Sequence, residues 1–162
     1  MADAIQYVTL GIGQELLGVS VERVREILEI QPVSRLPHAP THLLGMIDVR
    51  GQGVPVIDLR LKLGFEHAVD TENTRVIVLN VTIDERELTF GLKTDRVFEV
   101  TVLDEADLEP APEIGVKWRS EFISGIGRRN GRFVTVLDLG RLFTSGEMAL
   151  VAPLPDAGGR AA

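Results

Sequence analysis

The chain has 162 residues and a formal net charge of −7, because 24 acidic residues outnumber 17 basic ones. A surface of that sign repels phosphate backbones and anionic lipid over long range, which disfavours general nucleic-acid or membrane binding. The absence of cysteine excludes disulfide scaffolds, thiolate metal sites and cysteine nucleophiles. The first residues lack the pattern of a secretory signal, and no apolar run approaches the ~20 residues that span a bilayer. We therefore expect a cytoplasmic protein.

Short runs rich in β-branched residues, separated by Gly and Pro, dominate the chain. The runs that predict strands are 5–10, 16–19, 54–57, 76–81 and 133–137. Pro55 has no amide donor, so its strand is expected to lie at a sheet edge or to carry a bulge. Strands of this length are typical of small barrels and sandwiches.

Helical patterns are few. Val21, Val24 and Leu28 have the spacing of one helix face, and Ser20 stands where an N-cap is expected, so the pattern predicts a helix over 21–28. Residues 58–63 predict a short turn with a counterpart at 138–143, although the alternation of apolar residues in 58–63 also permits a strand.

The second half of the chain repeats the first. Six residues recur at a constant offset of 80 positions: Gly45/Gly125, Gly51/Gly131, Val54/Val134, Val56/Val136, Asp58/Asp138 and Leu59/Leu139. Upstream, Gly18 and Val24 recur as Gly91 and Val97 at an offset of 73, which places an insertion near 109–113. A unit of roughly sixty to seventy residues buries too little surface to be stable alone, so the two copies should share a core.

No constellation of catalytic residues emerges. His38 and His42 have the spacing of a helical metal pair, but two prolines interrupt that stretch and no Cys or further His completes a site. Neither a Gly-x-Ser-x-Gly elbow nor a Gly-Lys-Ser/Thr phosphate loop is present. Asp58 and Asp138 recur in both copies, which indicates helix caps or turns. With aromatic residues at 5%, a base-stacking platform is disfavoured, and the chain is best interpreted as a module that offers surfaces to other proteins.

Seven short segments keep one order and spacing from about residue 5 to residue 150. They are 18–28, 35–40, 44–51, 54–60, 94–97, 110–112 and 122–127. Each is weak alone, but together they closely resemble CheW, the family of coupling proteins in bacterial chemotaxis. The resemblance implies a mostly β fold of two intertwined five-stranded SH3-like barrels with short helices. It covers one domain over 5–150, with subdomains at approximately 14–68 and 74–145 and the N-terminal strand packed on them; 151–162 are predicted to be a disordered tail.

The resemblance also implies a non-catalytic adaptor that needs no cofactor and no metal. CheW-like proteins bind the regulatory domain of the histidine kinase CheA and the cytoplasmic tip of methyl-accepting chemoreceptors. They join both into receptor arrays and place kinase activity under receptor control, with no nucleic acid and no direct membrane insertion. Two alternatives remain: a CheW paralogue that serves a non-motility pathway, and, from a different class, a small β-barrel ligand-binding or enzyme domain with an unrecognised site.

The family's receptor-facing groove lies between the two barrels. The resemblance places Val24, Glu26 and Ile27 in it, with Val100 from the second copy and Arg50 at a neighbouring loop. A helical hairpin tip would lay its apolar face on the floor of such a groove. The alternative is structural: the three apolar residues are core, the acid is solvated, and the arginine anchors its own loop by bonding carbonyls.

Two segments depart from the family pattern. The family's Asn-Leu-Arg-Gly motif reads Asp-Val-Arg-Gly at 48–51, so that Asp48 replaces a neutral amide and is able to pair with Arg50. Residues 93–95 read Lys-Thr-Asp where the family has an apolar residue before Val-Asp. The second departure concerns the local edge of the second barrel and leaves the predicted fold unchanged.

Overall fold

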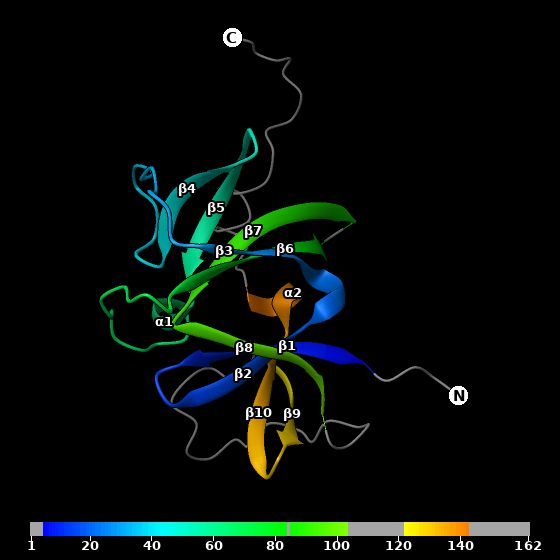
Figure 1. Ribbon diagram of the computed structural model, residues 1–162. Coiled ribbons are helices and arrows are strands. Elements are labelled where there is room, and N and C mark those ends of the chain that lie inside the picture. Colours follow the sequence, from blue (N-terminus) through cyan, green and yellow to red (C-terminus); the bar gives the residue numbers. More distant parts are fainter. Residues whose placement is uncertain (1–4, 84, 104–121, 143–162) are drawn as a thin grey trace.

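The computed structural model describes residues 5–83, 85–103 and 122–142 (Figure 1). The first half of the chain forms β1 (Gln6–Ile12), β2 (Glu15–Ser20), the 3-10 helix η1 (Val21–Arg23), β3 (Val24–Glu29), β4 (Leu43–Val49), β5 (Gln52–Asp58) and α1 (Leu59–Lys62). The second half forms β6 (Arg75–Ile83), β7 (Arg86–Thr94), β8 (Arg96–Val102), β9 (Ile123–Arg129), β10 (Arg132–Leu137) and α2 (Leu139–Leu142). The predicted tail at 151–162 and the predicted insertion at 109–113 lie outside the described residues.

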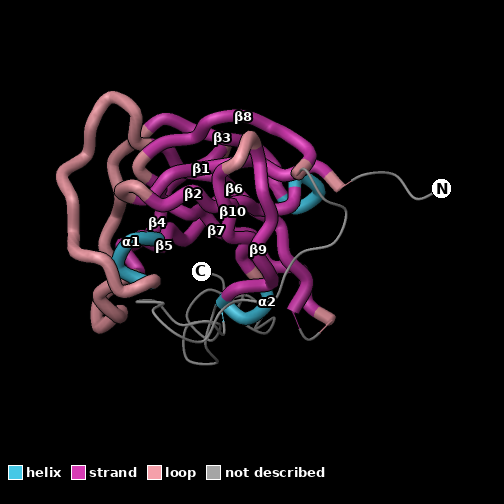
Figure 2. Tube along the Cα trace, turned by 90° about the horizontal axis from the view of Figure 1, so that it is seen from below, coloured by secondary structure: helices cyan, strands magenta, loops and turns pink. Residues whose placement is uncertain are grey.

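Each of two five-stranded sheets takes strands from both halves of the chain. Sheet A has the order β8-β1-β2-β10-β9, and sheet B has the order β3-β6-β7-β5-β4. The hairpin that opens one copy, β1–β2 or β6–β7, thus pairs with the last three strands of the other copy. This exchange confirms the predicted fold class of two intertwined five-stranded barrels. Figure 2 shows the strands of both sheets filling the body of the molecule, with the short helices at its periphery.

The repeat found in the sequence is also a repeat of structure. In each copy, a two-stranded hairpin leads into a four-residue helix: β4–β5 into α1 and β9–β10 into α2. The Asp58 N–H donates to the His42 carbonyl at 2.8 Å, and the Asp138 N–H donates to the Phe122 carbonyl at the same distance. The Asp58 carboxylate accepts two backbone N–H groups of α1, and that of Asp138 accepts one of α2. The interpretation of these aspartates as helix caps is confirmed.

The core is shared between the two sheets, as the size of each copy requires. The largest hydrophobic cluster, here called the central cluster, joins Leu10 and Leu17 of sheet A to Ile77 and Phe90 of sheet B. We call the barrel formed by sheet A barrel A and the one formed by sheet B barrel B. A smaller cluster fills each of them: Ile47, Val49, Val54, Val56, Val76 and Val78 in barrel B, and Tyr7, Leu103, Val134 and Val136 in barrel A. Successive residues of a strand such as β6 point alternately into the barrel and into the central cluster, which follows from the period of a strand.

The predicted helix over 21–28 is wrong. Only Val21–Arg23 turn helically, and Val24–Glu29 form an edge strand that pairs with β6. The segment 58–63, by contrast, contains the predicted short turn, because Leu59–Lys62 form α1 rather than a strand.

Pro55 is accommodated in a different way from the one predicted. Its strand, β5, is not an edge strand but lies between β4 and β7. The pairing of β5 with β7 begins at Val56, so the missing N–H of Pro55 interrupts no bond to β7. The register of the β4–β5 pair shifts between Leu43 and Gly45, and the bulge therefore lies on the partner strand.

An ion pair joins three connecting segments at one side of the shared core. Asp95, between β7 and β8, accepts the guanidinium of Arg60 in α1, with Nε–Oδ1 and Nη2–Oδ2 both at 2.9 Å. It also accepts the Gly13 N–H of the β1–β2 turn at 2.7 Å. Asp95 belongs to the Lys-Thr-Asp segment at 93–95 that departs from the family pattern. Lys93 of that segment pairs with Asp70, in the connection between the two copies. The Lys-Thr-Asp sequence is therefore held by charge pairs, and β7 includes its first two residues, ending at Thr94.

We expect Asp95→Asn to remove part of the loss of stability in acid. Burial alone would raise the pKa of Asp95, but the hydrogen bonds from Arg60 and Gly13 and the charges of Arg60 and Lys93 outweigh it and lower that pKa. A lowered pKa stabilises the folded state at pH values above the ordinary aspartate pKa of about 4. That stability is lost as the pH falls through the folded-state pKa. Urea unfolding between neutral pH and pH ~3 should show wild type and variant converging in acid. A constant difference between them would contradict this, and Glu87→Gln is the charge-matched surface control.

Candidate protein-binding site

Val24 and Ile27, two of the three candidate residues on β3, lie on the same face of sheet B. Val24 and Ile27 lie opposite Leu79 and Ile77 of β6, and both of these belong to the central cluster. Side chains of opposed residues in an antiparallel pair share one face of the sheet. Val24 is half-buried against the central cluster, whereas Ile27 stays 40% exposed at its margin. Apolar side chains on β3 therefore extend from the core between the two sheets to the molecular surface.

Strand β8 repeats this arrangement in the second copy. Val97 and Val100 lie opposite Leu10 and Val8 of β1, which also belong to the central cluster. Val97 is half-buried against that cluster, and Val100 is 51% exposed. The offset of 73 positions that relates the two copies converts Val24 into Val97 and Ile27 into Val100.

We call Val24, Ile27, Val97 and Val100 the edge strip. Each of its two strands is the edge of its own sheet, β3 of sheet B and β8 of sheet A. Both strands run along the same face of the molecule, in the view of Figure 1 and in the perpendicular view of Figure 2. The structural alternative holds in part, since Val24 also contributes to the core, while Ile27 and Val100 are too exposed to be core residues.

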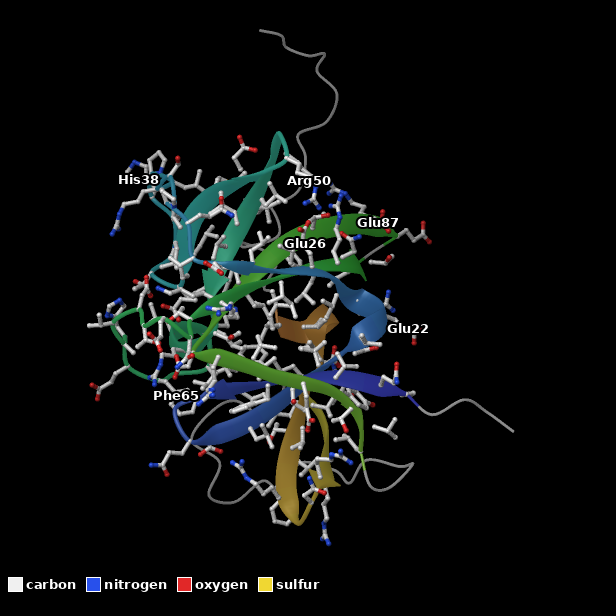
Figure 3. The ribbon with its side chains drawn as sticks, viewed as in Figure 1. Glu22, Glu26, His38, Arg50, Phe65 and Glu87 are labelled. Atoms are coloured by element: carbon white, nitrogen blue, oxygen red, sulfur yellow. The ribbon has the colours of Figure 1, made fainter. Side chains whose placement is uncertain are left out.

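An ion pair joins β3 to the turn between β4 and β5. Arg50, in the turn between β4 and β5, extends toward Glu26 in Figure 3. Its Nη1 donates to Glu26 Oε1 at 3.0 Å, and its Nη2 donates to Oε2, so the pair is bidentate. The Arg50 side chain is 71% exposed and that of Glu26 is 19% exposed. Most of the arginine side chain thus remains exposed to solvent, while the glutamate fixes its position.

The interaction predicted for Asp48 does not form with Arg50. The Asp48 carboxylate instead accepts the Gly51 N–H at 2.7 Å and braces the turn. The alternative role of Arg50, as an anchor of loop carbonyls, is replaced by the pair with Glu26. No local motif signals this pair, because it is the closure of barrel B that brings its two residues together.

Arg50 occupies a backbone conformation that its residue type disfavours. The two-residue turn has φ of 50° at Arg50 and 87° at Gly51, and the equivalent turn has 52° at Asn130 and 79° at Gly131. Both correspond to the hairpin turn that prefers Asn-Gly, in which the first residue is left-handed. Asn130-Gly131 follows that preference and Arg50-Gly51 does not. Arg50 therefore holds a left-handed conformation at the position where the second copy has an asparagine.

Two cavities accompany these surfaces. One, of about 400 Å³, lies beside η1 and is lined from both sheets, for example by Tyr7 and Leu137 of sheet A and Val81 of sheet B. The other, of about 390 Å³, opens from barrel B near Ile30 and Lys93.

Within the described ranges, no helix has the length and apolar character needed to cross a membrane.

Two barrels that exchange strands, with an apolar strip and an ion pair at their shared face, define a double-barrel β domain of the interaction type. The CheW-like domain family matches residues 6–147. The chain is 34% identical over 146 residues to the chemotaxis protein CheW of Klebsiella aerogenes, covering 90% of this chain and 86% of that protein. It is 30% identical over 156 residues to the chemotaxis protein CheW of Rhizobium meliloti, covering 91% and 97%.

A solved structure agrees with this assignment. The crystal structure of the scaffolding protein TtCheW from Thermoanaerobacter tengcongensis superposes with a TM-score of 0.78 at 26% identity, covering 91% of this chain and 92% of that one. The chain belongs to the CheW-like domain family.

Proposed function

We propose that this protein is a cytoplasmic, non-catalytic adaptor of a chemosensory pathway. It binds the regulatory domain of a CheA-type histidine kinase and the cytoplasmic tip of methyl-accepting chemoreceptors, and it places the kinase under receptor control within receptor arrays. The observation that carries the proposal is the edge strip beside the Glu26–Arg50 pair, in a chain whose relatives are named as chemotaxis and scaffolding proteins.

The geometry of the strip suits a helical partner. Ile27 and Val100 offer apolar surface on two edge strands that belong to different sheets. The apolar face of a helical hairpin bridges such a pair of strands, and removal of this surface from water provides most of the affinity. Glu26 and Arg50 lie at the rim, where charges set register and selectivity more than affinity.

We expect Ile27→Asp to weaken binding to a receptor-tip fragment at least tenfold, because it places a charge on the apolar contact surface. Ile27 is partly exposed, so the variant should still fold. Ile30→Asp is the matched control, since Ile30 is similarly exposed, at 37%, but lies beyond the end of β3. Isothermal titration with separate receptor-tip and kinase regulatory-domain fragments measures both contacts. Unchanged receptor binding by a folded Ile27→Asp variant would show that the strip is not the receptor surface.

We expect Arg50→Asn to weaken receptor or kinase binding several-fold without loss of stability. Asparagine is the residue of the equivalent turn at Asn130 and tolerates the left-handed conformation, so the hairpin is kept while the cation is removed. Titration with each fragment, together with thermal unfolding, separates a binding role from a structural one. Arg35→Asn, at another exposed arginine, is the control. Normal binding to both fragments would assign Arg50 to the turn alone.

A further inference from the structure

The β9–β10 hairpin has a charge opposite to that of the rest of the protein. Its residues 123–137 contain Arg128, Arg129 and Arg132 and no acidic residue, in a chain of net charge −7. The equivalent hairpin, 43–57, contains one Asp and one Arg. Because the two hairpins share their topology and turn conformation, the fold itself does not require this concentration of arginine.

An exposed phenylalanine stands among these arginines. Phe133 is 61% exposed, and the Arg128 guanidinium lies over its ring, 5.1 Å from the centroid. The two residues are opposed in the β9–β10 register, just as Asp48 and Gly53 are opposed in β4–β5. The other copy thus builds the same position with no aromatic side chain, so Phe133 is dispensable for the hairpin and exposes apolar surface to water without a structural need.

Arg129 is directed toward a carboxylate that does not satisfy it. Its Nε is buried without a hydrogen-bond partner, and it lies 3.8 Å from Glu99 Oε2 on β8. That distance is compatible with charge attraction but too long for a hydrogen bond. The guanidinium is therefore positioned by Glu99 and retains the capacity to bind a second carboxylate.

From these observations we propose that Arg128, Arg129, Arg132 and Phe133, here called the arginine tip, form a docking surface for an acidic protein segment that carries an aromatic or large aliphatic side chain. Guanidinium groups bind carboxylates in bidentate geometry, and an exposed aromatic ring beside them provides the apolar anchor. An acidic peptide meets three arginines and no carboxylate within residues 123–137, so this hairpin attracts it although the chain as a whole carries negative charge. A nucleic acid or an anionic bilayer presents an extended negative surface, which the remaining negative charge of the chain repels.

The arginine tip is distant from the Glu26–Arg50 pair, although Arg129 approaches Glu99, the neighbour of Val100 on β8. The β4–β5 and β9–β10 hairpins lie at opposite ends of the molecule in Figure 1, and Arg50 belongs to the former. A partner that occupies the tip therefore leaves the Glu26–Arg50 pair uncovered. The inference does not depend on the identity of the receptor or kinase partners proposed above.

The test replaces the tip with the residues of its own counterpart. The triple variant Arg128→Asp, Arg132→Gln and Phe133→Gly copies Asp48, Gln52 and Gly53, which the same hairpin geometry already accepts. The probe is a fluorescent peptide of about twelve residues built from Glu and Phe, measured by anisotropy with the full chain at low and physiological salt. A peptide with Gln in place of Glu is the charge control, and Arg35→Gln is the protein control.

We expect saturable binding of the Glu-Phe peptide that weakens at least tenfold in the triple variant, with the Gln-Phe peptide and with rising salt, while Arg35→Gln binds as wild type. Equal binding by wild type and the folded triple variant would overturn the proposal, as would no saturable binding by wild type. Tighter binding of phosphatidylserine vesicles or single-stranded DNA than of the peptide, lost in the triple variant, would overturn it in favour of a membrane or nucleic-acid contact.

Discussion

We expect Gly45→Ala to lower the free energy of unfolding by about 3 to 5 kcal/mol, from backbone strain together with two broken hydrogen bonds. Gly45 has φ of 146°, which side chains other than glycine rarely adopt. A Cβ at this position would lie 2.1 Å from the Ser34 carbonyl oxygen. That carbonyl accepts the Met46 N–H at 2.7 Å, and the Ser34 N–H donates back to Met46 at 2.8 Å. The clash thus falls on the backbone bridge that joins the segment after β3 to β4 and closes barrel B.

Gly53→Ala is the matched control for this prediction. A Cβ there would meet only the end of the Met46 side chain, at 2.9 Å, and that side chain can move away. Urea denaturation followed by far-ultraviolet circular dichroism should therefore show a change below about 1 kcal/mol for Gly53→Ala. Similar midpoints for the two variants would mean that barrel B does not depend on its bridge at Ser34.

The duplicated pattern of glycine, valine and aspartate predicts the fold well for a physical reason. Gly51 and Gly131 stand where each hairpin turns with positive φ, and Asp58 and Asp138 stand where each helix begins. These are local requirements of backbone conformation and capping, which only a few residue types meet. The exchange of hairpins between the sheets is different, because it depends on pairings between distant strands that leave no local trace.

The apolar residues that predicted a helix over 21–28 do not share one face, because Val21 and Val24 pack against the central cluster and Leu28 packs against the cluster of barrel B. In β3 the register with β6 shifts between Val24 and Glu26, so that Arg25 is the extra residue. Val24 and Ile27, three apart, consequently face the same side, as they would on a helix. For Val24 and Ile27, a strand with a bulge and a short helix thus produce the same spacing. The second copy holds the same bulge at Phe98, between Val97 and Glu99.

The candidate site is predictable only in its parts. The resemblance selected Glu26, Ile27, Arg50 and Val100, and the structure leaves Ile27 and Val100 exposed on two different edge strands. The pair between Glu26 and Arg50 joins residues 24 positions apart, through the closure of a barrel rather than any sequence motif. Asp48, which is nearer in sequence, was the predicted partner, but its carboxylate is used by the turn.

We expect Phe90→Ala to lower the free energy of unfolding by about 3 to 5 kcal/mol, the usual cost of a large cavity in a core. Phe90 is fully buried in the central cluster, to which both sheets contribute. Because β6–β7 belongs to sheet B while β8, from the same copy, belongs to sheet A, neither barrel can unfold without breaking strands that the other copy supplies or receives. The loss should therefore appear in one cooperative transition for the whole domain.

Calorimetry together with circular dichroism and fluorescence tests this coupling. Coincident transitions that shift together in Phe90→Ala support a shared core, and Phe133→Ala, which removes the same side chain from an exposed site, should change stability by less than about 1 kcal/mol. Two separate transitions, with only one displaced by Phe90→Ala, would show that each barrel keeps an independent core. In that case the edge strip, whose strands β3 and β8 belong to different sheets, would not be a rigid surface. The geometry proposed for receptor binding depends on that rigidity, because the helical partner must contact Ile27 and Val100 at the same time.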